Sequence, residues 1–257
     1  MSDIHPSAVV SGKADLADDV SVGPHTIIED NVVAGPGCRI ASNVLLASGA
    51  RLGAGVKVHH GAVIGTTPQD LKFGGEDSTA EIGDSTVVRE YATVNRGTVD
   101  RGKTVIGSDC LLMAYSHVAH DCLIGDHCIL ANSVNLAGHI EIGDWAILGG
   151  VLPVHQFVKI GAHSMIGGGF RVPLDICPYA LAGGYPLKIA GLNLVGLRRR
   201  GFEREAIRAL RKVFKLLFFS GLNTTQAVDR IRDEIEIIPE VKLVLDFIED
   251  SDRGLQK

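Results

Sequence analysis

The chain has 257 residues, 46% of them hydrophobic, which is enough for one large domain or for one domain with a small appendage. Only 5% are aromatic and 31 are glycine, so many short strands with Val, Ile and Leu cores are favoured over a conventional core. The formal net charge of −5 argues against a general nucleic-acid binder, which needs a basic surface.

The N-terminal segment, MSDIHPSAVV, lacks the basic stretch and apolar run of a signal peptide, and no window approaches the length of a membrane span. We therefore expect a cytoplasmic protein. The cysteines form no CxxC pair. Cys38, Cys110, Cys122 and Cys128 share a repeat position that elsewhere holds small side chains, so we interpret them as buried side chains and not as zinc or disulfide ligands.

Aliphatic residues recur at every sixth position from Ile4 to Val172, with four exceptions, three of which fall in interruptions at 66–80 and 97–103. A period of six fits neither an α-helix nor a simple alternating strand, and it predicts a solenoid of short strands and turns. Because the same phase resumes after each interruption, both segments are predicted to be loops extruded from the solenoid. Such loops often carry function.

Beyond Pro173 the repeat fades, and from Gly201 the spacing of apolar residues becomes helical. The segment EREAIRALRKVFKLLFF predicts a first helix, ended by Gly221. Two more helices are predicted, one across 224–237 and one from Val241 to about Ile248. We therefore predict a solenoid domain at 1–185 and a helical domain at 186–257.

The repeat over residues 4–175 resembles the hexapeptide-repeat family, whose members form a left-handed parallel β-helix with three hexads per coil. The fold class implied is mainly β, a left-handed parallel β-helix with a small C-terminal α-helical domain. Residues 18 apart would then lie above one another, separated by about 4.8 Å per coil. His120, Gly138 and Gln156 should form one outward column, with Asp121 and His139 in the adjoining one.

His120 is a candidate general base, because a histidine can take a proton from an alcohol at neutral pH while a backbone N–H holds the oxyanion of acyl transfer. Gly138 leaves room for a substrate to approach the backbone. No serine or cysteine lies in a nucleophile motif, so direct attack by the acceptor is favoured over a covalent enzyme. A zinc lyase is the alternative, although His117 and His120 are three apart, unlike the five-residue spacing in hexapeptide-repeat carbonic anhydrases. A non-catalytic scaffold is a third alternative.

Six motifs point to one family. They are PQDLKFGGE (68–76), REYATVNRGT (89–98), LLMAYSHVAHDC (111–122), ILANSVNLAGH (129–139), VHQF (154–157) and GLRRRGF (196–202). By these motifs the chain resembles, over nearly its whole length, the acyl-carrier-protein-dependent UDP-N-acetylglucosamine O-acyltransferases of lipid A biosynthesis.

The resemblance implies transfer of a 3-hydroxyacyl group from acyl carrier protein to the glucosamine 3-hydroxyl of UDP-N-acetylglucosamine. It also implies a homotrimer with sites between neighbouring prisms, and no metal or prosthetic cofactor. A 3-amino sugar acceptor is left open as an alternative.

The resemblance also implies roles for individual residues. His120 would be the general base, Asp121 would help to orient it, and the Gly138 N–H would hold the oxyanion. Arg199 and Arg200 would contact the diphosphate, for which the guanidinium fork is suited. The remaining contacts to the sugar nucleotide would come from Asp70, Lys72, His117, His139 and Gln156.

Three further features follow from the resemblance. Gly168 corresponds to the acyl-length position, where glycine leaves the groove open for a chain of about fourteen carbons or more. Asn95 stands where many members have histidine, so a role for an imidazole there is in doubt. A basic stripe on the first C-terminal helix would meet the acidic carrier protein. It comprises Arg204, Arg208, Arg211 and Lys215.

Overall fold

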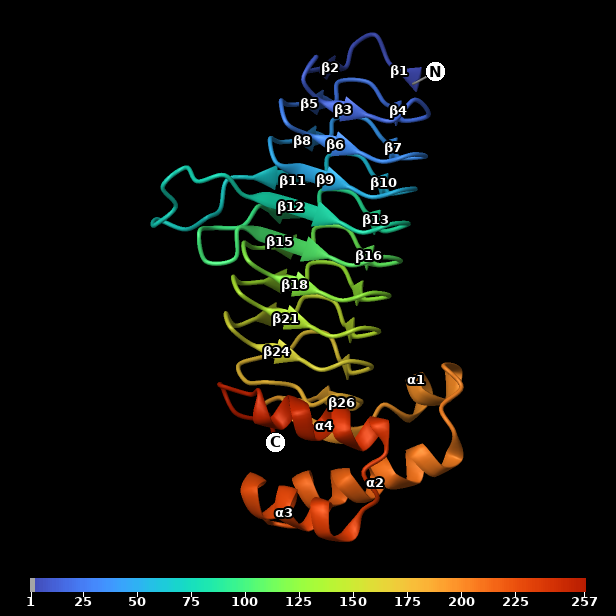
Figure 1. Cartoon of the computed structure of the whole chain (residues 1–257), viewed down its shortest axis with the longest axis vertical. Helices are drawn as coiled ribbons and strands as arrows, with labels where there is room; N and C mark the ends of the chain where they lie inside the picture. The colour runs from blue at the N-terminus through green and yellow to red at the C-terminus, as the bar shows by residue number, and fades with distance from the viewer. Residues whose placement is uncertain (1–2) are drawn as a thin grey trace.

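The computed structural model describes residues 3–257, which form a tall, three-sided stack of short strands closed at one end by helices (Figure 1). The strands make three sheets, in which every third strand of the chain is a neighbour. Pairing is parallel throughout except for the last hairpin. The solenoid predicted from the six-residue period is therefore confirmed as a parallel β-helix.

The first face, sheet A, consists of β1 (Asp3–Ile4), β4 (Ser21–Val22), β7 (Arg39–Ile40), β10 (Lys57–Val58), β13 (Val87–Val88), β16 (Leu111–Leu112), β19 (Ile129–Leu130), β22 (Ile147–Leu148), β25 (Met165–Ile166), β26 (Ala180–Gly183) and β27 (Lys188–Leu192). Sheet B consists of β2 (Val9–Val10), β5 (Ile27–Ile28), β8 (Leu45–Leu46), β11 (Val63–Thr66), β14 (Thr93–Asn95), β17 (His117–Val118), β20 (Asn135–Leu136) and β23 (Pro153–Val154). Sheet C consists of β3 (Asp15–Leu16), β6 (Val33–Ala34), β9 (Ala50–Leu52), β12 (Thr79–Ile82), β15 (Lys103–Ile106), β18 (Leu123–Ile124), β21 (Glu141–Ile142) and β24 (Lys159–Ile160).

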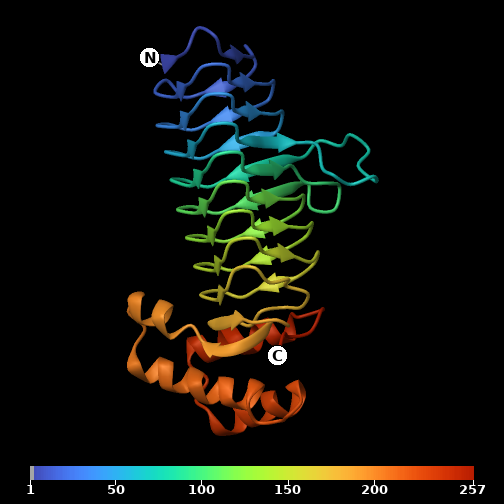
Figure 2. The same cartoon turned by 180° about the vertical axis from the view of Figure 1, so that it is seen from behind.

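Most coils contain 18 residues, as the pairing of His117 with Asn135 shows. Two coils are longer, because Lys57 pairs with Val87 and Thr93 pairs with His117. The additional residues leave the stack as loops 67–78 and 96–102, both at the corner where sheet B turns into sheet C. Figures 1 and 2 show the two loops projecting side by side from the same edge, as predicted.

The aliphatic residue of each hexad fills the inside of the prism, where Ile64, Leu112 and Leu130 are fully buried. The second inward position carries small side chains whose polar atoms bond to the backbone. The Cys122 thiol, for example, donates to the carbonyl of Ala137, 3.1 Å away. The four cysteines of the repeat are free and buried, as predicted, and so is Cys177; burial raises the pKa of Cys122 to about 12.

Corners of the prism are made with left-handed backbone, which is uncommon for residues other than glycine. At the corner between sheets B and C the positive φ angles belong to Asp121 (59°), His139 (63°) and Phe157 (63°). Because these residues are 18 apart, their side chains project from one edge in successive coils. The repeat thereby places polar and aromatic groups next to the extruded loops.

Four helices follow the β-helix: α1 (Leu194–Arg199), α2 (Arg204–Phe218), α3 (Thr224–Glu234) and α4 (Pro239–Glu249). The three predicted helices correspond to α2, α3 and α4. The last begins earlier than predicted because Pro239 occupies its first turn, where a missing N–H costs nothing. The boundary predicted at residue 185 lies in the turn between β26 and β27, two strands of sheet A.

Within residues 3–257, none of the helices combines the length and the apolar composition that crossing a bilayer requires.

Candidate active site

A cleft of about 650 Å³ lies at the corner between sheets B and C, under the extruded loops. Five of the residues predicted to form the site line it: Asp70 and Lys72 from loop 67–78, and His120, His139 and Gln156 from the corner. The repeat brings His120, His139 and Gln156 from three coils to one corner, and loop 67–78 adds Asp70 and Lys72 to the same cleft.

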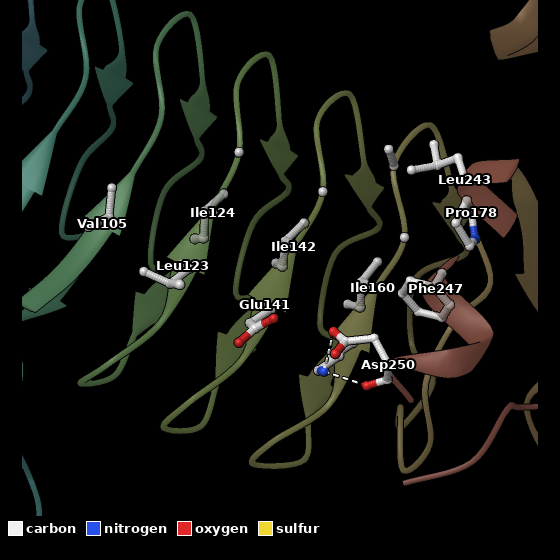
Figure 3. Close-up of a pocket in the computed structure, with 15 residues that line it drawn as sticks. Val105, Leu123, Ile124, Glu141, Ile142, Ile160, Pro178, Leu243, Phe247 and Asp250 are labelled. Atoms are coloured by element: carbon white, nitrogen blue, oxygen red, sulfur yellow. Dashed lines mark hydrogen bonds and ion pairs between the residues drawn. The ribbon is translucent and has the colours of Figure 1, made fainter. Parts of the chain in front are cut away.

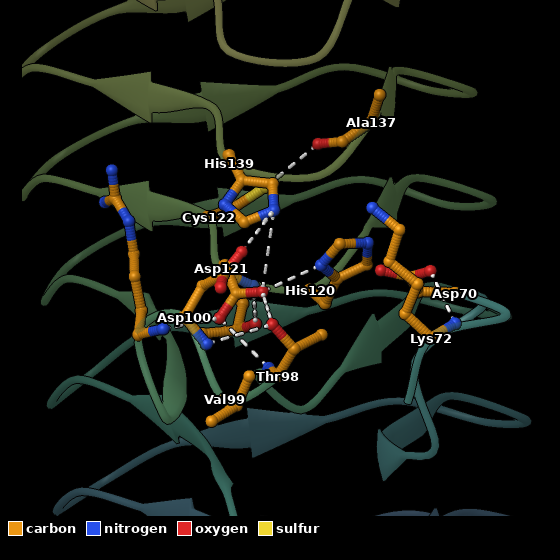
Figure 4. A network of polar contacts seen from close by, with 12 residues as sticks. Asp70, Lys72, Thr98, Val99, Asp100, His120, Asp121, Cys122, Ala137 and His139 are labelled. Atoms are coloured by element: carbon orange, nitrogen blue, oxygen red, sulfur yellow. Dashed lines mark hydrogen bonds and ion pairs between the residues drawn. The ribbon is translucent and has the colours of Figure 1, made fainter. Parts of the chain in front are cut away.

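His120 and Asp121 form a hydrogen-bonded pair on the cleft wall (Figure 4). His120 Nδ1 lies 2.8 Å from Asp121 Oδ2, and the two side chains are 12% and 0% exposed. A carboxylate only accepts hydrogen bonds, so Nδ1 carries a proton, and in the neutral imidazole the lone pair is on Nε2. This is the tautomer that a general base requires.

The Asp121 carboxylate is held by loop 96–102. Thr98 donates its backbone N–H to Oδ1 at 3.0 Å and its hydroxyl to Oδ2 at 2.6 Å, and the Arg101 N–H adds a bond to Oδ1 at 3.3 Å. Burial raises the pKa of Asp121, but the hydrogen bonds from Thr98 and His120 outweigh it and hold the pKa below its ordinary value. The carboxyl group is therefore ionised at neutral pH.

Two more histidines flank the pair. The ring of His139 stacks on Phe157 with centroids 4.6 Å apart and meets His120 edge-on at 5.1 Å. His117 Nδ1 is 2.7 Å from the hydroxyl of Thr93. Burial lowers the pKa of both His139 and His117. Both imidazoles are consequently neutral near pH 7 and can hydrogen-bond to a substrate without adding charge.

Gly138 is buried against the ring of His120. A Cβ at this position would lie 2.6 Å from His120 Cε1 and 2.8 Å from Nε2. Among the hydrogen bonds of residues 3–257, none uses the Gly138 N–H. A free amide donor therefore lies next to the free nitrogen of the histidine.

The two loops are tied together above the cleft. Glu76 accepts the N–H of Val99 at 3.0 Å, and the guanidinium of Arg96 lies over the ring of Phe73 at 5.3 Å. Asp70 accepts the N–H of Lys72 at 2.9 Å within the same loop. Glu76 and Thr98 were not predicted as functional, although both lie in the two interruptions and end the motifs PQDLKFGGE and REYATVNRGT.

Asn95 lies at the base of loop 67–78 and not in the cleft. It is 3% exposed, and its amide nitrogen donates to the Thr66 hydroxyl at 3.0 Å and to the Thr67 carbonyl at 3.1 Å. Asn95 therefore tethers the loop.

Arg199 and Arg200 lie at a different corner from the cleft. Arg200 follows α1 and donates to the carbonyl of Trp145 at 2.9 Å, with its guanidinium 5.1 Å from the centre of the Trp145 ring. Trp145 is in the turn between β21 and β22, where sheet C becomes sheet A. A single chain therefore does not bring the two arginines together with His120.

The remaining predicted residues lie outside the cleft as well. Gly168 is exposed, and a Cβ there would be 2.7 Å from the carbonyl oxygen of Gly150. The basic stripe on α2 is fully accessible. Its exposed members are Arg204, Arg208, Arg211 and Lys215.

His120, Asp121 and His139 offer ligand atoms that all lie within 4.8 Å of one another, so this group could also hold a metal ion. Imidazole nitrogen and carboxylate oxygen are suitable zinc ligands. The donor set alone therefore does not separate a metal centre from a general base.

A second hollow, of about 410 Å³, lies between sheet C and α4 (Figure 3). Leu123, Ile160 and Phe247 give it apolar walls, and the ion pair between Lys159 and Asp250, at 2.6 Å, crosses one end. It contains no histidine, cysteine or serine. We interpret it as a packing groove between the prism and the helices.

The β-helix makes the chain a hexapeptide-repeat protein, and matches to known families place it among the transferases of that class. The family model for bacterial transferase hexapeptides matches residues 103–138, and the model for domain 2 of UDP-N-acetylglucosamine O-acyltransferase matches residues 175–256.

Relatives and solved structures agree with these matches. Acyl-[acyl-carrier-protein]–UDP-N-acetylglucosamine O-acyltransferases from Chlorobaculum parvum and Aquifex aeolicus are 57% and 58% identical over 99% of this chain and 97% and 98% of theirs. The UDP-N-acetylglucosamine acyltransferase of Bacteroides fragilis superposes with a TM-score of 0.97 at 43% identity, covering 98% of this chain and 99% of the other. That of Moraxella catarrhalis gives 0.96 at 41% identity, covering 99% of each. The chain belongs to the acyl-[acyl-carrier-protein]–UDP-N-acetylglucosamine O-acyltransferase family.

Proposed function

We propose that this chain transfers a 3-hydroxyacyl group from acyl carrier protein to the glucosamine 3-hydroxyl of UDP-N-acetylglucosamine, the first step of lipid A biosynthesis. The relatives from Chlorobaculum parvum and Aquifex aeolicus are O-acyltransferases that use these two kinds of substrate. The observation that carries the proposal is the His120 and Asp121 pair, whose free Nε2 lies in a cleft next to the unpaired N–H of Gly138.

The geometry supports catalysis by a general base. Nε2 of His120 removes the proton of the acceptor hydroxyl, and the oxygen attacks the thioester carbonyl carbon. The negative charge that develops on the carbonyl oxygen is stabilised by the Gly138 N–H, and the ionised Asp121 stabilises the imidazolium. As the C–S bond breaks, the departing thiolate takes the proton from His120. The base is thereby regenerated without an acyl-enzyme.

Asp70, Lys72, His139 and Gln156 are proposed to hold the sugar nucleotide, because they line the same cleft as His120. His117, on β17 of the same coil as His120, does not line the cleft but lies close enough to His120 for their charges to interact. Lys72 supplies a positive charge to the phosphates, while the neutral His139 and the amide of Gln156 suit the sugar hydroxyls. A pocket lined only by positive charges would bind any phosphate compound and would not select for the sugar.

A homotrimer is proposed because the site is incomplete within one chain. Arg199 and Arg200 lie at the corner between sheets C and A, away from the cleft between sheets B and C. In a closed three-fold arrangement the corner between sheets C and A of one chain can face the corner between sheets B and C of its neighbour. Arg199, which is exposed, would then reach the diphosphate bound to the next chain.

The proposal is tested by following product mass with UDP-N-acetylglucosamine and a 3-hydroxyacyl carrier protein. Wild type should form the acylated sugar nucleotide, and His120→Ala should lose at least about a hundredfold in rate. His59→Ala is the matched control, since this half-exposed histidine pairs with Glu90 at 3.4 Å and is not part of the cleft. A wild-type trimer that acylates neither the 3-hydroxyl acceptor nor a 3-amino acceptor would contradict the proposed reaction.

Sharing of the site between chains is tested by mixing. His120→Ala and Arg199→Ala are each expected to be weakly active, whereas a mixture refolded together contains sites with both residues intact and should regain activity. Mixtures that are no more active than the sum of the two variants would place Arg199 outside the site of a neighbouring chain.

The exposed stripe of Arg204, Arg208, Arg211 and Lys215 is proposed to bind the acidic carrier protein. Charge complementarity mainly accelerates encounter, so the KM for the carrier should rise with salt. Arg208→Glu should raise that KM at low salt by about tenfold and leave the KM for the nucleotide unchanged. Lys57→Glu, a charge reversal at an exposed position on β10 in the N-terminal half of the prism, is the control.

A further inference from the structure

We propose that Thr98 is a positioning residue of the acyl transfer, whose hydroxyl keeps the Asp121 carboxylate in the orientation that accepts the His120 Nδ1–H. The inference rests on the proposed function, in which His120 is the base. It assigns a role to loop 96–102, which the repeat pattern identifies only as an interruption.

The hydroxyl of Thr98 and the ring of His120 share one oxygen. Asp121 Oδ2 is 2.6 Å from Thr98 Oγ1 and 2.8 Å from His120 Nδ1. The first distance is that of a charge-assisted O–H···O bond. Thr98 is 5% exposed and Asp121 is fully buried, so the carboxylate depends on protein donors more than on bulk water.

The direction of the hydroxyl is fixed by a second contact. The backbone N–H of Asp100 donates to Thr98 Oγ1 at 3.3 Å, so the oxygen is the acceptor in this contact. The hydroxyl hydrogen is therefore directed to the carboxylate of Asp121. Figure 4 shows Thr98 below the carboxylate and His120 to its side.

The hydrogen bond from Thr98 to Asp121 is important because a second histidine, His139, lies beside the same carboxylate. His139 Nε2 lies 3.8 Å from Asp121 Oδ2 and 3.7 Å from Asp100 Oδ2, too far for a hydrogen bond to either. Arg101, the other charged neighbour, turns its guanidinium away to Glu141. Without the Thr98 hydroxyl, only the N–H groups of Thr98 and Arg101 still hold the carboxylate, through Oδ1, so Oδ2 can turn towards His139 and the bond that fixes the His120 tautomer is weakened.

The contact between Thr98 and Asp121 also explains why the coil that contains loop 96–102 is longer than its neighbour. Thr93 pairs with His117 across 24 residues, where the neighbouring coil from His117 to Asn135 uses 18. The additional residues carry Thr98 and the N–H of Arg101 over the corner at Asp121. Loop 96–102 therefore surrounds the carboxylate with donors that a regular hexapeptide turn does not offer.

Two substitutions separate the hydroxyl from the shape of the side chain. Thr98→Val removes the hydroxyl and should lower kcat about tenfold while the KM of each substrate stays within about twofold, because a lost hydrogen bond to a buried charge is only partly compensated. Thr98→Ser keeps the hydroxyl and should restore most of the loss. Thr86→Val is the matched control, since Thr86 is also buried and donates to a backbone carbonyl, that of Gly107, at 2.7 Å.

The tautomer of His120 is read directly from the ¹⁵N shifts of its ring, without substrate. Wild type and Thr98→Ser should show the proton on Nδ1 alone, and Thr98→Val should show a second tautomer. This measurement is independent of turnover, so an inactive wild type would contradict the proposed function but leave the positioning role testable.

A double-mutant cycle completes the test. If Thr98 acts through Asp121, then Thr98→Val should cost nothing more in kcat once Asp121→Asn is present. Additive losses would overturn the proposal, as would Thr98→Val with the kcat and the single tautomer of wild type. Loss of kcat in Thr98→Ser equal to that in Thr98→Val would overturn it too.

Discussion

The ring of His120 lies directly against the backbone of Gly138 on the next coil, so close that a Cβ on Gly138 would be 2.6 Å from Cε1 and 2.8 Å from Nε2. The glycine matters in two ways: its N–H is used in none of the hydrogen bonds of residues 3–257, and its missing side chain leaves space for the imidazole. From the sequence, Gly138 was expected to hold the oxyanion through its N–H and to leave room for the substrate. Its contact with the imidazole of His120 was not expected.

Gly138→Ala should therefore displace the base. We expect kcat to fall by about a hundredfold, because a shift of about 1 Å in a catalytic group can cost that much. The melting temperature should change by only a few degrees, since the imidazole is a side chain that can move. Gly12→Ala, with no atom within 4 Å of the new Cβ, is the control. An unchanged kcat would mean that the ring position is not critical.

Asp121→Asn tests the carboxylate of the pair. An amide can donate to His120 and so favour the tautomer with the proton on Nε2, which cannot act as a base. We expect kcat to fall by at least about a hundredfold with little change in KM. Asp109→Asn removes a half-exposed carboxylate 3.8 Å from His127 and should have no effect on kcat. Equal activity in the two variants would argue against the pair.

The fold and most of the cleft follow from the sequence because a solenoid converts sequence separation into distance. Once the period of six is known and the family resemblance supplies three hexads per coil, a separation of 18 residues implies neighbouring coils, as for His120 and Gly138. The contact between Thr98 and Asp121 has no such rule, since it depends on the path of an inserted loop. The attachment of Arg200 to Trp145 depends on the packing of α1, which no repeat describes.

Acidification should destabilise the protein through His163. Burial and the adjacent Arg200 lower its pKa to about 4. In the unfolded chain a histidine titrates near pH 6.5, so between those values the unfolded state binds more protons and stability falls as the pH drops. The loss by pH 4 should be about 2 kcal/mol, discounted for partial exposure.

Urea unfolding at pH 7 and pH 4.5 checks the contribution of His163. His163→Phe keeps the stacking on Tyr179 and removes the titrating group, so the variant should lose less stability than wild type on acidification. The same loss in both proteins would assign the acid sensitivity to other groups.

Glycine after the aliphatic residue of a hexad allows successive coils to approach. A Cβ on Gly83 would lie 2.5 Å from the carbonyl carbon of Gly107 and 2.6 Å from the nitrogen of Ser108, both backbone atoms. Gly83→Ala should therefore reduce the free energy of unfolding by about 1–3 kcal/mol, the usual cost of overpacking. Gly12→Ala again serves as the control in urea unfolding, and equal stability of the two variants would show that the coils can separate at little cost.

Gly168 tests the acyl-length prediction, and the structure changes how that test must be designed. A Cβ at Gly168 would lie 2.7 Å from the oxygen and 3.0 Å from the nitrogen of Gly150, so any side chain moves backbone before it fills a groove. Gly168→Ala reproduces the backbone clash with little bulk and should lower the melting temperature while leaving the preference for long donors intact. Gly168→Met adds the bulk and should shift kcat/KM from donors of about fourteen carbons towards donors of about ten. The ratio of kcat/KM for the two donors is measured in both variants. A shift in Gly168→Ala as large as in Gly168→Met would attribute chain-length selection to the position of the Gly150 backbone and not to the volume of the side chain.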